Sequence, residues 1–166
     1  DFVVRSNYME GMGNGVFGVN AAITRGQIVT ILYRMEGEPG VDGLENAFTD
    51  VKEGKFYTEA VLWAASQGIV EGNGDGTFKP EAAITREQLA AILYRYDGEQ
   101  AVAEDVLSAF SDAGKVSNFA KEAMNWAVAN GLINGIGNGA SATLSPTASA
   151  SRAQFATILM RYMTEE

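Results

Sequence analysis

A pentapeptide that recurs three times constrains this chain more than any other feature. Its copies begin at residues 23, 84 and 150 and have the sequences Ile-Thr-Arg-Gly-Gln, Ile-Thr-Arg-Glu-Gln and Ala-Ser-Arg-Ala-Gln. Thr or Ser followed three residues later by Gln is a capping box, which satisfies free N–H groups at a helix start. An apolar residue before each cap and another at the fourth helical position form a hydrophobic staple. The pattern therefore predicts three helices that begin in the same way.

The arginine of the pentapeptide does not help its own helix to start. It occupies the first helical position, where a cation faces the positive end of the helix dipole at a cost of roughly 0.3–1 kcal/mol. We therefore expect Arg25, Arg86 and Arg152 to make contacts outside their own helices. The partner is either an anionic ligand or a carboxylate of a neighbouring repeat.

A longer repeat surrounds the pentapeptide. Residues 48–96 correspond to residues 110–162, with an insertion in the second glycine-rich loop, whereas residues 11–34 match only the second half of that pattern. Self-similarity of this kind indicates a repeat architecture. The predicted division is repeat 1 at residues 1–40 (its C-terminal half only), repeat 2 at residues 41–104 and repeat 3 at residues 105–166.

Each full repeat predicts a helix, a glycine loop and a second helix. The first helices are expected near residues 57–67 and 118–130, with Trp63 on one apolar face and Phe119 and Trp126 on the other. The second helices are expected near residues 25–35, 86–96 and 152–163. Left-handed caps are expected after the first helices, at Gly68 and Gly131, with Asn7 at the matching position of repeat 1.

Two-helix units of this size cannot bury their apolar faces alone, so the copies must pack on one another. We expect a mainly α fold in which three helix–loop–helix repeats form a pseudo-threefold helical cluster, with the second helices inside. An open stack satisfies the same pattern. Polar, glycine-containing linkers at residues 37–46 and 98–108 join the repeats.

The composition narrows the possible functions. The 166 residues include neither Cys nor His, which excludes disulfides, thiol catalysis and the commonest general base and metal ligand. The net charge of −9 argues against nucleic acid. No apolar run reaches the length of a membrane span, and no secretory signal starts the chain, although one upstream can have been removed. We expect no enzyme activity and no cofactor.

Acidic residues suggest two further kinds of site, neither of which we favour. The loop at residues 71–76 has part of the spacing of a calcium loop, but Ala82 stands where the bidentate acid is needed. Glu59 and Glu122 occupy matching positions of two repeats, whereas hydrolytic carboxylates must share a cleft. The sequence thus predicts no metal site and no catalytic pair.

The motifs together resemble the S-layer homology family. Its pattern contains Phe-x-Asp-Val, Ala-Val-x-Trp-Ala, Gly-Ile-Val-x-Gly, Asp-Gly-x-Phe-x-Pro and Ile-Thr-Arg-Ala-Glu. Residues 47–96 match nearly throughout, residues 109–163 match well, and residues 2–35 match the second half only. The resemblance implies an extracellular module that anchors a surface protein non-covalently to the bacterial cell wall or S-layer. Its partner would be secondary cell-wall polymer, whose pyruvylated N-acetylmannosamine termini lie in grooves between repeats.

The resemblance also implies which residues bind the ligand. In the family, ligand contacts come from the motif arginine, the Phe-x-Asp aspartate, the helix tryptophan and the glycine loop. The corresponding residues here are Arg25, Arg86 and Arg152, Asp50 and Asp112, Trp63 and Trp126, and Gly72, Gly74, Gly135 and Gly137, with Gly11 and Gly13 in repeat 1. Gln replaces the family's motif acid in all three copies, and repeat 1 lacks the aspartate. One of three possible grooves is therefore expected to be incomplete.

Each of these residue types also has a structural interpretation. Trp63 and Trp126 can stack on a sugar or anchor the core. Asp50 and Asp112 can bind sugar hydroxyls or cap the turn before the first helix. A guanidinium suits the carboxylate of a pyruvate ketal, and helix-start N–H groups are expected to add donors for the same anion. The alternative function is a protein–protein assembly module that contacts neighbouring surface-layer subunits through the same grooves.

Overall fold

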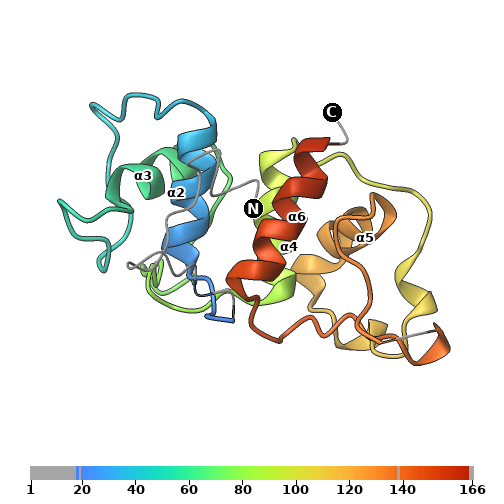
Figure 1. Ribbon diagram of the computed structural model, residues 1–166. Helices are drawn as coiled ribbons and strands as arrows, with labels where there is room; N and C mark the ends of the chain where they lie inside the picture. The colour runs from blue at the N-terminus through green and yellow to red at the C-terminus, as the bar shows by residue number, and fades with distance from the viewer. Residues whose placement is uncertain (1–17, 19, 138, 165–166) are drawn as a thin grey trace. The chain divides into compact units, whose positions relative to one another are not determined.

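The computed structural model describes residues 18, 20–137 and 139–164, and Figure 1 shows the chain. This part contains the α-helices α2 (Arg25–Met35), α3 (Thr58–Ser66), α4 (Arg86–Tyr96), α5 (Lys121–Ala129) and α6 (Arg152–Thr164). Short 3₁₀ helices are η1 (Leu107–Ala109), η2 (Ala113–Lys115), η3 (Asn118–Ala120) and η4 (Gly139–Ser141). Within these residues, β-structure is limited to isolated bridges, so the predicted mainly α class is confirmed. None of the described helices has the length and apolarity to cross a membrane.

The capping boxes form as the pentapeptide predicts. The side-chain oxygens of Thr24 and Thr85 each accept a hydrogen bond from the third helical N–H, and the Gln side chain at that position returns one. Ser151 and Gln154 make the same pair of bonds at the start of α6. The predicted caps at Gly68 and Gly131 are also confirmed, with φ of 71° and 69°. Asn7 lies outside the described residues.

The chain divides into two compact units that do not follow the sequence repeats. Unit 1 comprises residues 1–83, and unit 2 comprises residues 84–166. The boundary lies directly before the pentapeptide of repeat 2. Each unit therefore joins the second helix of one repeat to the first half of the next, because α2 packs on α3 and α4 packs on α5. The three-repeat boundaries and their pseudo-threefold arrangement stay predictions.

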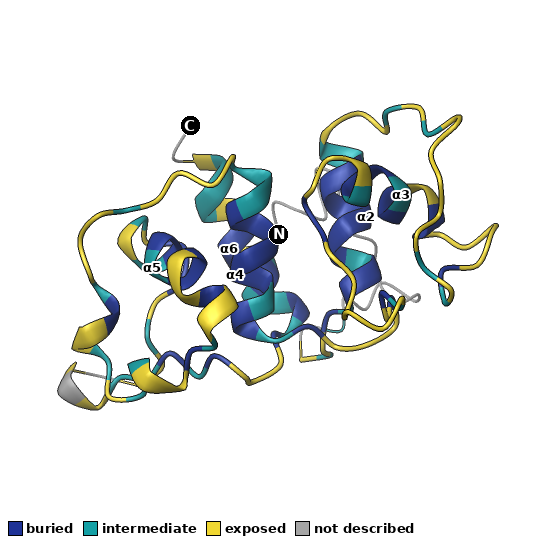
Figure 2. Ribbon diagram, turned by 180° about the vertical axis from the view of Figure 1, so that it is seen from behind, coloured by how far each residue is buried: buried dark blue, intermediate teal, exposed yellow. Residues whose placement is uncertain are grey.

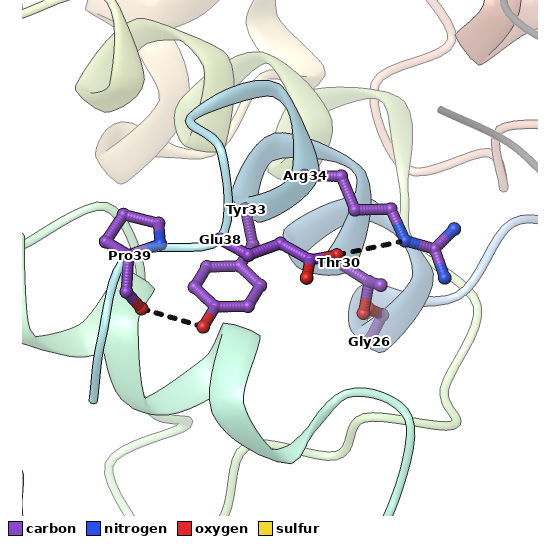
Figure 3. Close-up of polar contacts among 6 residues, drawn as sticks. All are labelled: Gly26, Thr30, Tyr33, Arg34, Glu38 and Pro39. Atoms are coloured by element: carbon purple, nitrogen blue, oxygen red, sulfur yellow. Dashed lines mark hydrogen bonds and ion pairs between the residues drawn. The ribbon is translucent and has the colours of Figure 1, made fainter. Parts of the chain in front are cut away.

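Unit 1 is held together by the packing of α2 on α3. Figure 2 colours much of both helices as buried, and Ile28, Leu32 and Val61 are fully buried. The rings of Tyr33 on α2 and Trp63 on α3 lie 5.6 Å apart between centroids. The Tyr33 hydroxyl donates to the Pro39 carbonyl at 2.7 Å, so the start of the linker is tied to the same helix (Figure 3).

Unit 2 repeats this packing and adds α6. The ring of Tyr94 on α4 lies 5.6 Å from that of Trp126 on α5, as in unit 1. At the ends of α4 and α6, Tyr162 packs on Tyr96 and donates from its hydroxyl to Asp97 at 3.0 Å.

One predicted core residue of unit 2 is wrong. Phe119 is 59% exposed, and the neighbouring Ala120 is buried in its place. The cause is local, because residues 118–120 form the 3₁₀ turn η3 rather than the first turn of α5, which shifts the buried face by one residue.

Candidate ligand groove and the arginine contacts

The motif arginines of α2 and α4 reach the glycine loop of the following repeat. Arg25 Nε donates to the Phe78 carbonyl at 2.8 Å, and its guanidinium carbon lies 4.7 Å from the centroid of the Phe78 ring. Arg86 Nε donates to the Leu144 carbonyl at 2.8 Å, and Nη2 donates to the Asn134 carbonyl at 3.2 Å. The following repeat thus supplies backbone carbonyls to both arginine side chains.

The N–H groups at the starts of α2 and α4 also bond to the following repeat. The N–H groups of Arg25 and Gly26 donate to the carbonyls of Ala82 and Pro80 at 3.0 and 2.7 Å. In α4, the first two N–H groups donate in the same way to Ala148 and Pro146, both at 2.9 Å. The expectation that these groups serve a ligand anion is therefore wrong for both helices, because the chain itself already satisfies them.

The Phe-x-Asp aspartates hold the same loops from within their own repeat. The two carboxylate oxygens of Asp50 accept from the N–H groups of Phe78 and Lys79, both at 2.8 Å. Those of Asp112 accept from Leu144 and Ser145 at 2.8 and 2.9 Å. The carboxylates therefore fix the backbone at the loop end, and Asp112 makes no side-chain cap bond to η2. Their contact with a ligand stays a prediction.

Electrostatics agrees with this fixed geometry in unit 2. Burial of Asp112 by itself raises its pKa, but the bonds from Leu144 and Ser145 outweigh burial, so the pKa lies below its ordinary value. Burial lowers the pKa of Arg86, while the nearby Asp112 opposes that shift. Arg152 is buried as well, and burial lowers its pKa. Two motif arginines thus carry a desolvation cost, which the nearby Asp112 offsets in part for Arg86.

The glycines of the loop have two different roles. A Cβ built on Gly72 would lie 2.8 Å from the Phe48 ring, and one on Gly135 would lie 2.5 Å from the Phe110 ring. Gly74 and Gly137 have φ of 83° and 94°, which glycine adopts without strain. Gly72 and Gly135 therefore let the Phe-x-Asp segment lie against its loop, whereas Gly74 and Gly137 allow the turns of the loop. Gly11 and Gly13 lie outside the described residues.

The two tryptophans are core residues in this geometry. Trp63 is 6% exposed and Trp126 is 4% exposed. Trp63 packs on Tyr33 of α2, and Trp126 packs on Tyr94 of α4. A ring buried in this way presents no open face to a sugar. The packing supports the core interpretation, and direct stacking on a glycan stays a prediction.

A groove of about 240 Å³ opens in unit 2 beside Arg86. It lies between the start of α4, the segment that follows α5, and α6. Its lining residues are Arg86, Leu132, Ile133, Asn134, Ala153, Gln154, Thr157, Ile158 and Arg161. Two cations and two amides therefore line a partly apolar groove, and no carboxylate is among the described residues that line it. Arg86 is the predicted site residue that the groove contains.

Sequence reasoning missed Arg161 and Asn134. Arg161 Nη1 donates to the Leu132 carbonyl at 3.3 Å. With the Asn134 amide oriented so that its oxygen faces Arg161, that oxygen accepts from Nη1 and Nη2 at 3.2 and 3.1 Å. A signal for Arg161 was available, because an arginine recurs nine residues after each motif arginine, at positions 34, 95 and 161. Nine residues are about two and a half helical turns, which puts the two arginines of one helix on opposite faces.

The acidic loop of unit 1 is organised by its own side chains. Asp75 Oδ1 accepts from the N–H and the hydroxyl of Thr77 at 3.0 and 2.6 Å, and these bonds lower the pKa of Asp75. Across the described part of the chain, no three acidic side chains gather as they would around a metal ion.

Comparison with known proteins identifies the family. The S-layer homology domain model matches residues 2–29, 47–90 and 109–156. The surface-layer 125 kDa protein of Lysinibacillus sphaericus is 33% identical over 162 residues, which cover 96% of this chain and 13% of that protein. An amylopullulanase of Thermoanaerobacterium thermosulfurigenes is 31% identical over 91% of this chain and 8% of its own length. A cellulosome-anchoring protein of Acetivibrio thermocellus is 26% identical over 93% of this chain and 35% of its own.

These relatives are much longer proteins, so the chain spans about a third of their length or less. The family model, in contrast, covers most of the chain and includes all three pentapeptide arginines. The chain therefore belongs to the S-layer homology family.

Proposed function

We propose that this chain anchors a surface protein non-covalently to the bacterial cell wall by binding the pyruvylated amino-sugar termini of secondary cell-wall polymer. The family and its surface-layer relatives place the chain at the bacterial cell surface. A relative named as cellulosome-anchoring carries a similar segment, which supports an anchoring role. The segment also occurs in an amylopullulanase, over 8% of its length, which supports a binding module that is separate from the catalytic part.

The observation that carries the proposal is the pair of arginines in the groove of unit 2. Neither Arg86 nor Arg161 forms an ion pair with a described carboxylate, and all their hydrogen bonds go to neutral oxygens. Arg86 is only 5% exposed, so its charge is largely removed from water. A fixed carboxylate, such as that of a pyruvate ketal, would pair with both arginines and matches the planar guanidinium.

The test is sedimentation of the chain with purified cell walls, with and without mild-acid removal of the pyruvate ketals. We expect binding to the untreated walls to fall sharply once pyruvate is lost, and to weaken as salt screens the charges. Equal binding to treated and untreated walls contradicts the proposal.

A second candidate is a protein–protein assembly module. Phe56 and Phe119 occupy matching positions of two repeats and are 63% and 59% exposed. Exposed aromatic rings of this kind favour contact with another protein. This function predicts that wall binding survives removal of pyruvate. It also predicts that wall binding falls when Phe56 and Phe119 are both replaced by Ser.

A further inference from the structure

The two arginines of the groove are organised by one residue, Asn134. Its backbone carbonyl accepts from Arg86 Nη2 at 3.2 Å. With its amide oriented so that the side-chain oxygen faces Arg161, that oxygen accepts from Arg161 Nη1 and Nη2 at 3.2 and 3.1 Å. Arg86 comes from α4 and Arg161 from α6, so Asn134 joins two guanidinium groups that the sequence separates. Both groups donate to neutral oxygens, and Asp112 acts on Arg86 only as a nearby charge.

Repeat 2 carries a different residue at this position. The segment Gly131–Gly135 corresponds to Gly68–Gly72, and Glu71 stands where repeat 3 has Asn134. An amide accepts hydrogen bonds from arginines without neutralising them, whereas a carboxylate forms an ion pair and repels a second anion. One substitution between otherwise similar repeats therefore changes the charge that this position contributes.

We propose that Asn134 is a specificity-determining residue, and that with Arg161 it makes the unit 2 groove selective for a carboxylate-bearing glycan. The neutral amide holds Arg161 beside Arg86 and leaves two positive charges for one ligand carboxylate. Arg161 is thereby the second cation of the site. This inference rests on the proposed function, because it names the residues that read the charge of the same ligand.

The test compares two forms of one probe, the purified pyruvylated wall polymer and the same polymer after mild-acid depyruvylation. Calorimetry gives the affinity ratio, which is the affinity for the pyruvylated polymer divided by that for the depyruvylated polymer. A defect that is only structural lowers both affinities alike, whereas a lost charge contact lowers the ratio. The variants are Asn134→Glu, which copies repeat 2, and Arg161→Met, which keeps the apolar stem without the charge. Glu71→Asn, the reverse exchange, is the matched control.

We expect Asn134→Glu and Arg161→Met each to reduce the affinity ratio by roughly tenfold or more, since a like charge or a lost cation acts on the anionic form alone. Glu71→Asn is expected to keep or raise the ratio. Asn134 is exposed, so its replacement should leave the melting temperature close to that of the parent. If the parent discriminates between the polymers and both variants do so equally well, the inference fails while the proposed function stands. If the parent itself binds both polymers equally, the proposed function fails.

Discussion

The Arg86 guanidinium donates a hydrogen bond to the Leu144 carbonyl at 2.8 Å, although the two residues lie 58 positions apart in different sequence repeats. Asp112 binds the N–H of the same Leu144 from inside repeat 3. Arg25, Phe78 and Asp50 form the corresponding contacts in unit 1. The motif arginine therefore joins one repeat to the next within the chain itself, without a ligand. This explains why the compact units cross the repeat boundaries.

Replacement of Arg86 by Ala should accordingly do more than remove a ligand contact. It also removes the bonds to the carbonyls of Leu144 and Asn134. Arg86→Lys is more informative, because it keeps the charge and loses the fork of donors. We expect it to lower the free energy of unfolding by about 1–3 kcal/mol, as measured by urea denaturation. Lys55→Arg, an exchange of cations at an exposed position, is the control and should change little.

Asp112 should make the stability of the chain sensitive to acid. Its folded-state pKa is lowered, so its stabilising effect is present above the unfolded-state pKa of about 4 and is lost as the pH falls through the lower folded-state value. Asp112→Asn removes one acceptor and the charge, and should lower the free energy of unfolding at pH 7 by about 1–3 kcal/mol. Thermal unfolding between pH 7 and pH 2 tests both effects. A variant that loses stability in acid as steeply as the parent argues against this role of Asp112.

Trp126→Phe separates a core role from a ligand role. The indole packs on Tyr94 and is 4% exposed, so the smaller ring leaves unfilled volume at a cost of about 1–3 kcal/mol. We expect the melting temperature to fall and the affinity for wall polymer, measured well below that temperature, to stay within about twofold. A large loss of affinity in the folded variant would instead support direct stacking of Trp126 on the glycan.

Gly26→Ala should destabilise unit 1, although alanine is the better helix former by about 1 kcal/mol. The added Cβ would lie 2.9 Å from the Pro80 carbonyl oxygen, to which the Gly26 N–H already donates. Backbone at this junction cannot move without loss of that bond, so overpacking of about 1–3 kcal/mol should outweigh the gain in helix propensity. Gly40→Ala, where a Cβ meets nothing within 4 Å, serves as the control. Calorimetric melting of both variants compares them directly, and equal melting temperatures contradict the expected overpacking.

The sequence by itself determined the helices and their ends. Capping boxes, staples and left-handed glycines act over three or four residues, so the starts at Arg25, Arg86 and Arg152 follow from local chemistry alone. The repeat also identified the arginine as a residue with a role outside its own helix. The one local error, at Phe119, came from a 3₁₀ turn whose pattern differs from that of an α-helix by one residue.

Only the tertiary structure decided what those arginines contact. The Phe78 carbonyl that Arg25 binds lies 53 residues away, and backbone carbonyls carry no sequence signature that could identify them. For the same reason, the sequence did not identify Asn134 and Arg161 as groove residues. They meet because a loop and a helix of repeat 3 fold beside the start of α4. Periodicity assigns a side chain to one face of its helix. The neighbour on that face is decided when distant segments bury their apolar surfaces against one another.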